Sequence, residues 1–93
     1  MRDSSVTNPY GSAEKLCNNL FKEYGLHFEM RHRYDPNFGV EYKIYEIPFE
    51  GRAKMISSGI GPGPAMEYLA YHYTGPKADK VKMVYQRFRN STV

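Results

Sequence analysis

The sequence predicts an α+β domain in which a helix precedes three antiparallel strands and a second helix follows them. Near both ends of the chain, apolar residues recur at helical spacing, whereas between them apolar and polar residues alternate. The length of 93 residues suits one domain with one core. Because alternating strands bury a single face, we expect a three-stranded sheet with both helices packed on that face.

Three segments follow from these patterns. Residues 1–11 are polar and end in a turn sequence, which predicts a flexible N-terminal segment. Residues 12–73 carry the periodic patterns and are expected to form the folded domain. Residues 74–93 form a basic C-terminal extension.

The first helix is predicted from Ser12 to Tyr24. Its apolar positions follow spacings of three, one, three, one and three, and they are Ala13, Leu16, Cys17, Leu20, Phe21 and Tyr24. Ser12 is expected to cap its start, and Gly25 is placed to end it.

Three strands are predicted next. The first alternates from Leu26 to Tyr34, and a turn over 35–39 leads into the second, in which Val40, Tyr42 and Ile44 share a face. Pro48 cannot donate to a ladder, so it marks a bulge or the end of that strand. After a turn at Glu50-Gly51, residues 52–58 are expected to return as the third strand.

A second helix follows the glycine- and proline-rich residues 57–64. Its apolar positions are Ala65, Met66, Leu69, Ala70 and Tyr73, and Thr74-Gly75-Pro76 stops it. The pattern over 80–88 is helical in spacing but also half-alternating. It favours a short third helix, and a strand stays open as the alternative.

Composition narrows the function classes. The net charge of +3 leans toward an anionic partner, and aromatic residues make up 15% of the chain. The single cysteine, Cys17, excludes an internal disulfide and suits a reducing compartment, so we expect an intracellular protein, cytoplasmic or nuclear. No apolar run approaches the roughly 18 residues of a membrane span, and no secretory signal is expected.

Several short motifs occur in one order along residues 8–73. Asn8-Pro9 precedes the first helix, Gly25-Leu26 joins it to the first strand, and Asp35-Pro36-Asn37-Phe38 stands four residues before Tyr42. Gly59-Ile60-Gly61 then precedes the second helix. In this order and spacing, the chain resembles the double-stranded RNA-binding domain family.

The resemblance implies a fold that contacts A-form RNA by shape through three regions, and two of these regions differ here. The family has three lysines at the start of its second helix, and this sequence has Pro64, Ala65 and Tyr68 there. Phe38 stands where the family has a loop histidine. Three missing lysines remove about three phosphate contacts, which weakens duplex binding.

The glycine- and proline-rich turn before the second helix also lacks other features of an anion-binding site. Pro62 and Pro64 have no N–H to donate, and Glu67 is expected to place a negative charge in the first helical turn.

The resemblance therefore favours a non-catalytic module of an RNA-processing or RNA-silencing protein that binds another protein or a second copy of itself. Members without the lysines use the third strand's edge or the second helix in this way. The interface candidates are Arg52, Lys54, Ile56, Tyr68, Tyr71 and His72. The alternative for Tyr68, Tyr71 and His72 is that they cover the sheet edge or cap the tail.

RNA binding through relocated positive charge is the alternative function. The candidates are Lys15, Lys22, Arg31, Arg33, Phe38, Lys77, Lys80, Lys82, Arg87 and Arg89. Aromatic residues among the tail cations also suit single-stranded RNA. A solvated face explains the same charges without any ligand.

Catalysis is not expected. The three histidines and Cys17 show no metal-ligand spacing, and residues 59–64 lack the Lys-Ser/Thr of a nucleotide-binding loop. We therefore expect no enzyme activity, no cofactor, no metal, no small-molecule substrate and no membrane partner.

Overall fold

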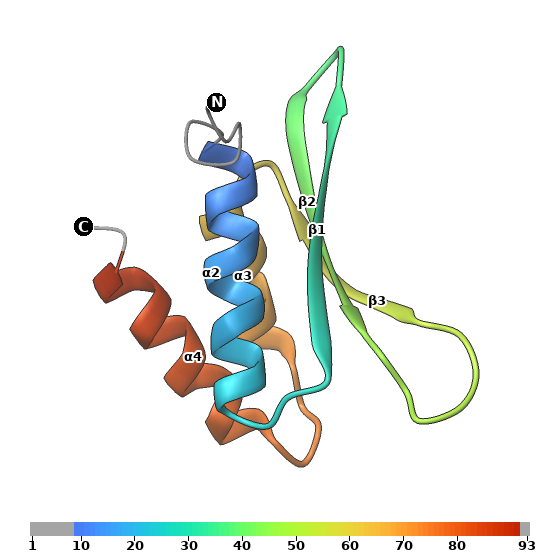
Figure 1. The fold of residues 1–93 in the computed structure, drawn as a ribbon, viewed down its shortest axis with the longest axis vertical. Helices are drawn as coiled ribbons and strands as arrows, with labels where there is room; N and C mark the ends of the chain where they lie inside the picture. The colour runs from blue at the N-terminus through green and yellow to red at the C-terminus, as the bar shows by residue number, and fades with distance from the viewer. Residues whose placement is uncertain (1–8, 92–93) are drawn as a thin grey trace, which may run out of the picture.

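A computed structural model describes residues 9–91 and has the element order helix, three strands, two helices (Figure 1). The elements are α2 (Pro9–Glu23), β1 (Phe28–Asp35), β2 (Gly39–Glu46), β3 (Lys54–Gly59), α3 (Pro62–His72) and α4 (Ala78–Ser91). The predicted α+β class and the order of its elements are confirmed.

The three strands form one antiparallel sheet in the order β1-β2-β3. Ile44 of β2 lies opposite Met30 of β1 and Ser57 of β3, and the register shifts by one residue between Ile44 and Tyr45. Helices α2 and α3 cover one face of the sheet, and α4 packs on both helices from the far side (Figure 1). The described residues therefore form three layers, and none of their helices lies on the other face of the sheet.

Helix α2 begins at Pro9, three residues before the predicted start. Proline suits the first turn of a helix because its missing N–H would have no intrahelical partner there. The expectation that Ser12 caps the helix is wrong, since Ser12 lies within it. Residues 9–11 are helical, and the rest of the predicted flexible segment, residues 1–8, lies outside the described residues.

The end of α2 follows the prediction. Gly25 has a φ of 71°, the left-handed conformation that favours glycine. Its N–H donates to the Lys22 carbonyl at 3.1 Å, and the Leu26 N–H donates to the Phe21 carbonyl at 2.8 Å. These two bonds satisfy carbonyls at the helix end and turn the chain into β1.

The strand pattern sorts the side chains as the alternation predicts. Phe28, Met30, Tyr42 and Ile44 are buried beneath the helices. Tyr34, which belongs to the same series, is exposed because the β1–β2 hairpin extends past the helical layer (Figure 1). β2 ends at Glu46, which agrees with the expectation of a strand end near Pro48.

Residues 80–88 lie within helix α4, so the predicted third helix is confirmed and the strand alternative is wrong. Helix α4 buries Val81, Val84 and Phe88 against α2 and α3. These residues belong to the same core cluster as Phe21 and Leu69. The core therefore continues past residue 73.

Cys17 lies on the buried face of α2, fully shielded from solvent. Burial disfavours the thiolate and raises the pKa of the Cys17 thiol to about 12. The thiol is therefore neutral at physiological pH. Across residues 9–91, no helix is long and apolar enough to cross a membrane.

Candidate functional site

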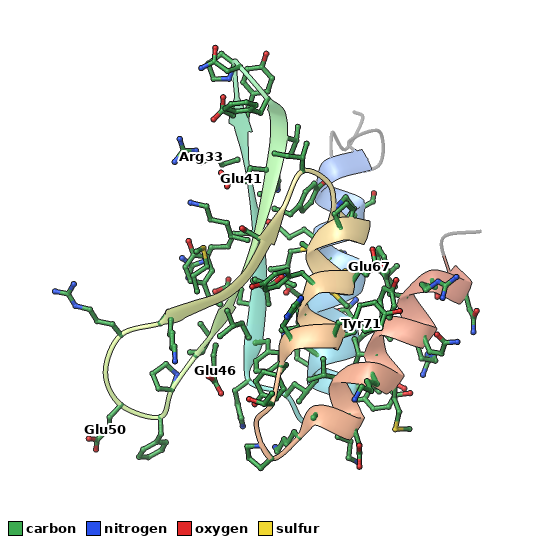
Figure 2. The ribbon with its side chains drawn as sticks, turned by 180° about the vertical axis from the view of Figure 1, so that it is seen from behind. Arg33, Glu41, Glu46, Glu50, Glu67 and Tyr71 are labelled. Atoms are coloured by element: carbon green, nitrogen blue, oxygen red, sulfur yellow. The ribbon has the colours of Figure 1, made fainter. Side chains whose placement is uncertain are left out.

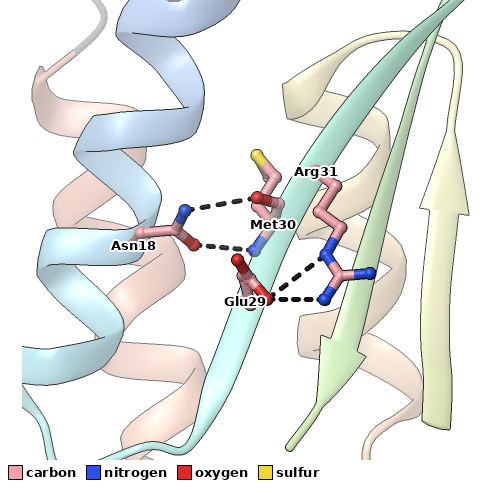
Figure 3. Close-up of polar contacts among 4 residues, drawn as sticks. All are labelled: Asn18, Glu29, Met30 and Arg31. Atoms are coloured by element: carbon pink, nitrogen blue, oxygen red, sulfur yellow. Dashed lines mark hydrogen bonds and ion pairs between the residues drawn. The ribbon is translucent and has the colours of Figure 1, made fainter. Parts of the chain in front are cut away.

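The outer edge of β1 is closed at Met30 by a side chain of α2. The Asn18 amide donates to the Met30 carbonyl at 3.2 Å, and its side-chain oxygen accepts from the Met30 N–H at 2.7 Å (Figure 3). Both Met30 backbone groups are thereby bonded outside the sheet, where a further strand would otherwise bond them. A hydrogen bond of 3.0 Å between the His32 ring and the Glu14 carboxylate joins the same two elements further along.

The outer edge of β3 is not closed in this way. β3 is the other terminal strand of the sheet. Among residues 9–91, no backbone group of β3 is hydrogen-bonded to an element other than β2. A terminal strand with free backbone groups is a template for pairing with another strand.

Apolar and aromatic side chains flank this open edge. Met55 is 50% exposed and Tyr68 of α3 is 49% exposed. Tyr68 stacks on His72 with ring centroids 4.1 Å apart. Tyr68 lines a hollow of about 310 Å³ with β3 residues that include Met55 and Ile56, and His72 lines a neighbouring hollow of about 470 Å³ that includes Lys54. We call Lys54, Met55, Ile56, Ser58, Tyr68 and His72 the β3-edge surface.

The structure thus brings together four of the six predicted interface residues, Lys54, Ile56, Tyr68 and His72, and Tyr71 lies apart from them. Tyr71 points toward α4, where its ring meets the Tyr85 ring edge-to-face at 6.3 Å (Figure 2). Tyr71 nevertheless remains 68% exposed. Arg52 lies in the loop before β3.

The glycine-rich loop between β3 and α3 has a packing role. A Cβ on Gly59 would lie 2.8 Å from the Ala65 backbone nitrogen, so only glycine allows β3 and α3 to approach this closely. Gly61 has a φ of 121°, which also favours glycine. Ser57 of β3 donates its hydroxyl to the Ala65 carbonyl at 2.6 Å. The loop and this bond hold α3 onto the strand.

The start of α3 has little capacity to bind an anion. Of its first three residues, only Gly63 carries an N–H, because the other two are Pro62 and Pro64. Ala65 is 0% exposed, so a cation at this position would be buried. The expectation that Glu67 lies in the first turn is wrong, because α3 begins at Pro62 and its first turn has no acidic residue.

Three cations of the sheet, Arg31, Arg33 and Lys43, lie on the face without helices. Arg31 pairs with Glu29 at 2.9 Å and lies over the Tyr45 ring at 4.6 Å. Figure 2 shows Arg33 and Glu41 on this side, away from the helices. Lys43 contacts Glu41 at 3.9 Å. Carboxylates therefore offset part of the positive charge of this face.

The cations of the tail lie on the opposite side of the helical layer. Arg87 donates to the Glu23 carboxylate at 2.9 Å and to the Tyr24 hydroxyl at 3.1 Å, which ties α4 to α2. Arg89 lies 5.7 Å from the Tyr85 ring centre. The remaining exposed cations of the helices and their connections are Lys15, Lys22, Lys77, Lys80 and Lys82. Helices α2 and α3 separate the tail cations from Arg31 and Arg33, so the structure does not gather the RNA-contact candidates on one surface.

Phe38 lies at the tip of the β1–β2 hairpin and is 70% exposed. The Asp35 carboxylate fixes this tip by accepting the Asn37 N–H at 2.8 Å and the Phe38 N–H at 3.3 Å. Phe38 is therefore far along the hairpin from the cations of α4.

Three features of these surfaces were missed from the sequence. Nothing in the sequence distinguishes Asn18 from an ordinary polar residue of a helix, so its hydrogen bonds to β1 could not be predicted. Met55 was not singled out, although its place in the third strand was predicted. Phe49, in the β2–β3 loop, is fully exposed, and a Pro-Phe pair within a charged loop is a signal that could have identified it.

Within residues 9–91, no three His, Cys, Asp or Glu side chains lie close enough to hold a metal ion. Comparison with protein-family models, with curated proteins and with solved structures finds no match to the chain.

Proposed function

We propose that this chain is a non-catalytic module, similar to a double-stranded RNA-binding domain, through which an RNA-processing or RNA-silencing protein docks another protein or a second copy of itself. The partner adds a strand to β3. The observation that carries the proposal is the contrast between an open β3 edge flanked by Met55 and Tyr68 and a β1 edge closed by Asn18.

Strand addition suits the chemistry of this surface. Each backbone hydrogen bond to an added strand contributes about 0.5–1.5 kcal/mol net, and main-chain pairing requires no particular partner sequence. The half-exposed Met55 and Tyr68 side chains add apolar area that a partner strand would cover. Tyr68 is held against His72, so little side-chain freedom remains to be lost on binding.

The same structure argues against strong duplex-RNA binding. Ala65 is buried, Pro64 has no charge, and Tyr68 faces β3, so the start of α3 supplies no phosphate-binding cation. The remaining cations are distributed over the sheet face without helices, helix α4 and the loop beside β3. Because affinity for RNA grows with the number of phosphates neutralised together, a divided set of cations binds weakly.

Light scattering during size-exclusion chromatography tests self-association, and two tyrosines of one helix give matched variants. If the chain pairs through β3, Tyr68→Ala lowers the dimer fraction and Tyr71→Ala does not. A dimer that only Tyr71→Ala disrupts would move the interface to the surface between α3 and α4. A concentration-independent monomer assigns the added strand to another protein.

A gel-shift titration with duplex RNA at low salt tests the alternative. The proposal expects little binding. Sub-micromolar affinity that falls steeply with added salt would overturn it and support the RNA-binding function.

A further inference from the structure

A groove lies between the β2–β3 loop and the connection from α3 to α4, next to the first residue of β3. Its floor is formed by Leu26, Phe28 and Tyr73, and one wall by Ile47, Pro48 and Phe49. The volume is about 590 Å³, within the range of roughly 300–1,000 Å³ typical of binding pockets. We call this hollow the loop groove.

The floor of the loop groove is anchored in the core. The Phe28 ring meets the Tyr73 ring edge-to-face with centroids 5.4 Å apart, and it meets Phe21 of the core in the same way at 5.4 Å. A floor anchored in the core keeps its shape before a ligand arrives, which lowers the entropic cost of binding.

Two hydrogen bonds hold the surroundings of the groove. The Ile47 N–H donates to the His27 carbonyl at 2.7 Å and holds the start of the loop beside β1. The Lys77 ammonium donates to the Gly25 carbonyl at 2.7 Å and ties the α3–α4 connection to the turn after α2. Both sides of the hollow are therefore fixed to the sheet or to α2.

Phe49 is the feature that folding leaves unexplained. Its side chain is 101% exposed, so it gains no stabilisation from burial within this chain. Fully burying such a side chain contributes about 1.5–3 kcal/mol, and aromatic side chains beside a pocket are frequent anchors of protein interfaces.

The charges around the groove indicate the chemistry of the partner. Arg52, Lys54 and Lys77 line it together with the carboxylates Glu46 and Glu50, and Figure 2 shows both carboxylates on the side of this loop. Cations therefore exceed carboxylates, in a chain whose net charge is +3. In the described part of the chain, no carboxylate lies within ion-pair distance of Arg52 or Lys54, whereas Arg31, Lys43 and Arg87 each have one.

We propose that the loop groove binds an acidic segment of a partner protein that carries one large apolar anchor residue. The anchor covers Phe28 and Tyr73 and packs against Phe49, while neighbouring Asp or Glu side chains pair with Arg52 and Lys54. Lys54 belongs both to the groove and to β3, so an added strand on β3 leads directly into the groove. Because the partner's segment would continue from a strand added to β3, the inference rests on the proposed function. It adds the chemical class of the partner.

A random peptide-display library selected on the whole chain supplies the probe. Enriched peptides should place an aromatic or long aliphatic residue within a few positions of two or more acidic residues. Binding of a synthetic enriched peptide is then measured by fluorescence anisotropy, and protection of the residue 54–59 amides by hydrogen exchange.

Phe49→Ala and Arg52→Glu should each weaken that peptide about tenfold or more. Phe38→Ala is the matched control, because Phe38 is also an exposed phenylalanine in a hairpin loop and lies at the other end of the sheet. It should leave binding unchanged. Glu50→Gln should strengthen binding, since it removes a negative charge from the rim. Thermal unfolding should show that none of these exposed substitutions alters the fold.

The outcomes separate this inference from the proposed function. Peptide binding that depends on Phe49 and protects residues 54–59 supports both. Protection of β3 by peptides that bind Phe49→Ala equally well overturns the groove inference alone. Dependence on Phe49 without protection of β3 overturns strand addition alone. Enrichment of basic peptides, or of none, overturns the inference.

Discussion

The two edge strands of the sheet, β1 and β3, both direct backbone N–H and carbonyl groups away from the sheet. They differ in whether a neighbouring helix bonds those groups. At β1, an Asn18 amide bonds both backbone groups of Met30. At β3, the neighbouring helix contributes Tyr68 and His72 beside the strand and leaves the backbone edge to solvent. Terminal strands are a liability that proteins usually protect. A fold that protects one edge with a specific side chain and leaves the other open has a surface suited to strand pairing.

Removing the protection of β1 should give the largest change in stability. Asn18→Ala leaves the Met30 N–H and carbonyl without partners in a half-buried site, so we expect the free energy of unfolding to fall by about 3 kcal/mol. Urea denaturation measures it. Asn19→Ala, on the exposed side of the same helix, is the control. A loss below about 1 kcal/mol would mean that water replaces the asparagine, and the closed edge would then be no more protected than β3.

The junction on the open side depends on Gly59. Gly59→Ala forces a Cβ against the Ala65 backbone, and we expect a loss of about 2 kcal/mol. Gly63→Ala provides the contrast, because open space surrounds a Cβ there and alanine favours the helix by about 0.5–1 kcal/mol. Thermal unfolding of both variants tests whether the loop serves packing. Equal effects would contradict it.

Two neighbouring serines of β3, the buried Ser57 and the exposed Ser58, allow the two faces of this strand to be compared. Ser57→Ala removes the buried hydroxyl bond to the Ala65 carbonyl and should cost about 1 kcal/mol. Ser58→Ala, at the exposed neighbouring position, should have almost no effect on stability. If Ser58→Ala destabilises the chain as much as Ser57→Ala, the β3 edge is less accessible than the structure indicates.

The pH dependence of stability tests how well the buried face of α2 shields the Cys17 thiol from water. Its folded pKa of about 12 lies above the ordinary 9.0, so the folded state retains a proton that the unfolded state loses as the pH rises. Stability is therefore lost above pH 9. Between pH 8 and pH 9.5, the free energy of unfolding should fall by about 0.8 kcal/mol more in the natural chain than in Cys17→Ala. Parallel pH curves for the two would mean that the thiol ionises within the fold.

Much of the fold could be predicted from periodicity. The alternation of Met30, Tyr42 and Ile44 with polar neighbours indicated the buried face of the sheet, because side chains on a strand point to opposite faces in turn. Helix starts were less predictable. Ser12 has the chemistry of a cap, yet Pro9 begins α2, because proline fits the first turn and the helical pattern extends further back.

The candidate site was predictable in part. Lys54, Ile56, Tyr68 and His72 were expected at an interface and lie around one edge, since a strand and the helix after it are adjacent in sequence. Tyr71 and His72 lie on opposite sides of Tyr68 around α3, because three residues turn a helix by about −60° and four by about +40°. Only the position of α4 shows which of these sides remains open.

The sequence by itself determined the class of fold, the buried face of each element and the absence of lysine from the start of α3. These properties depend on residue type and spacing, which are local. The tertiary structure decided which sheet edge is open, which cations share a face, and that Phe49 stands beside a groove. Each of these depends on contacts between residues far apart in the chain, such as Asn18 with Met30 and Lys77 with Gly25, and periodicity carries no information about them.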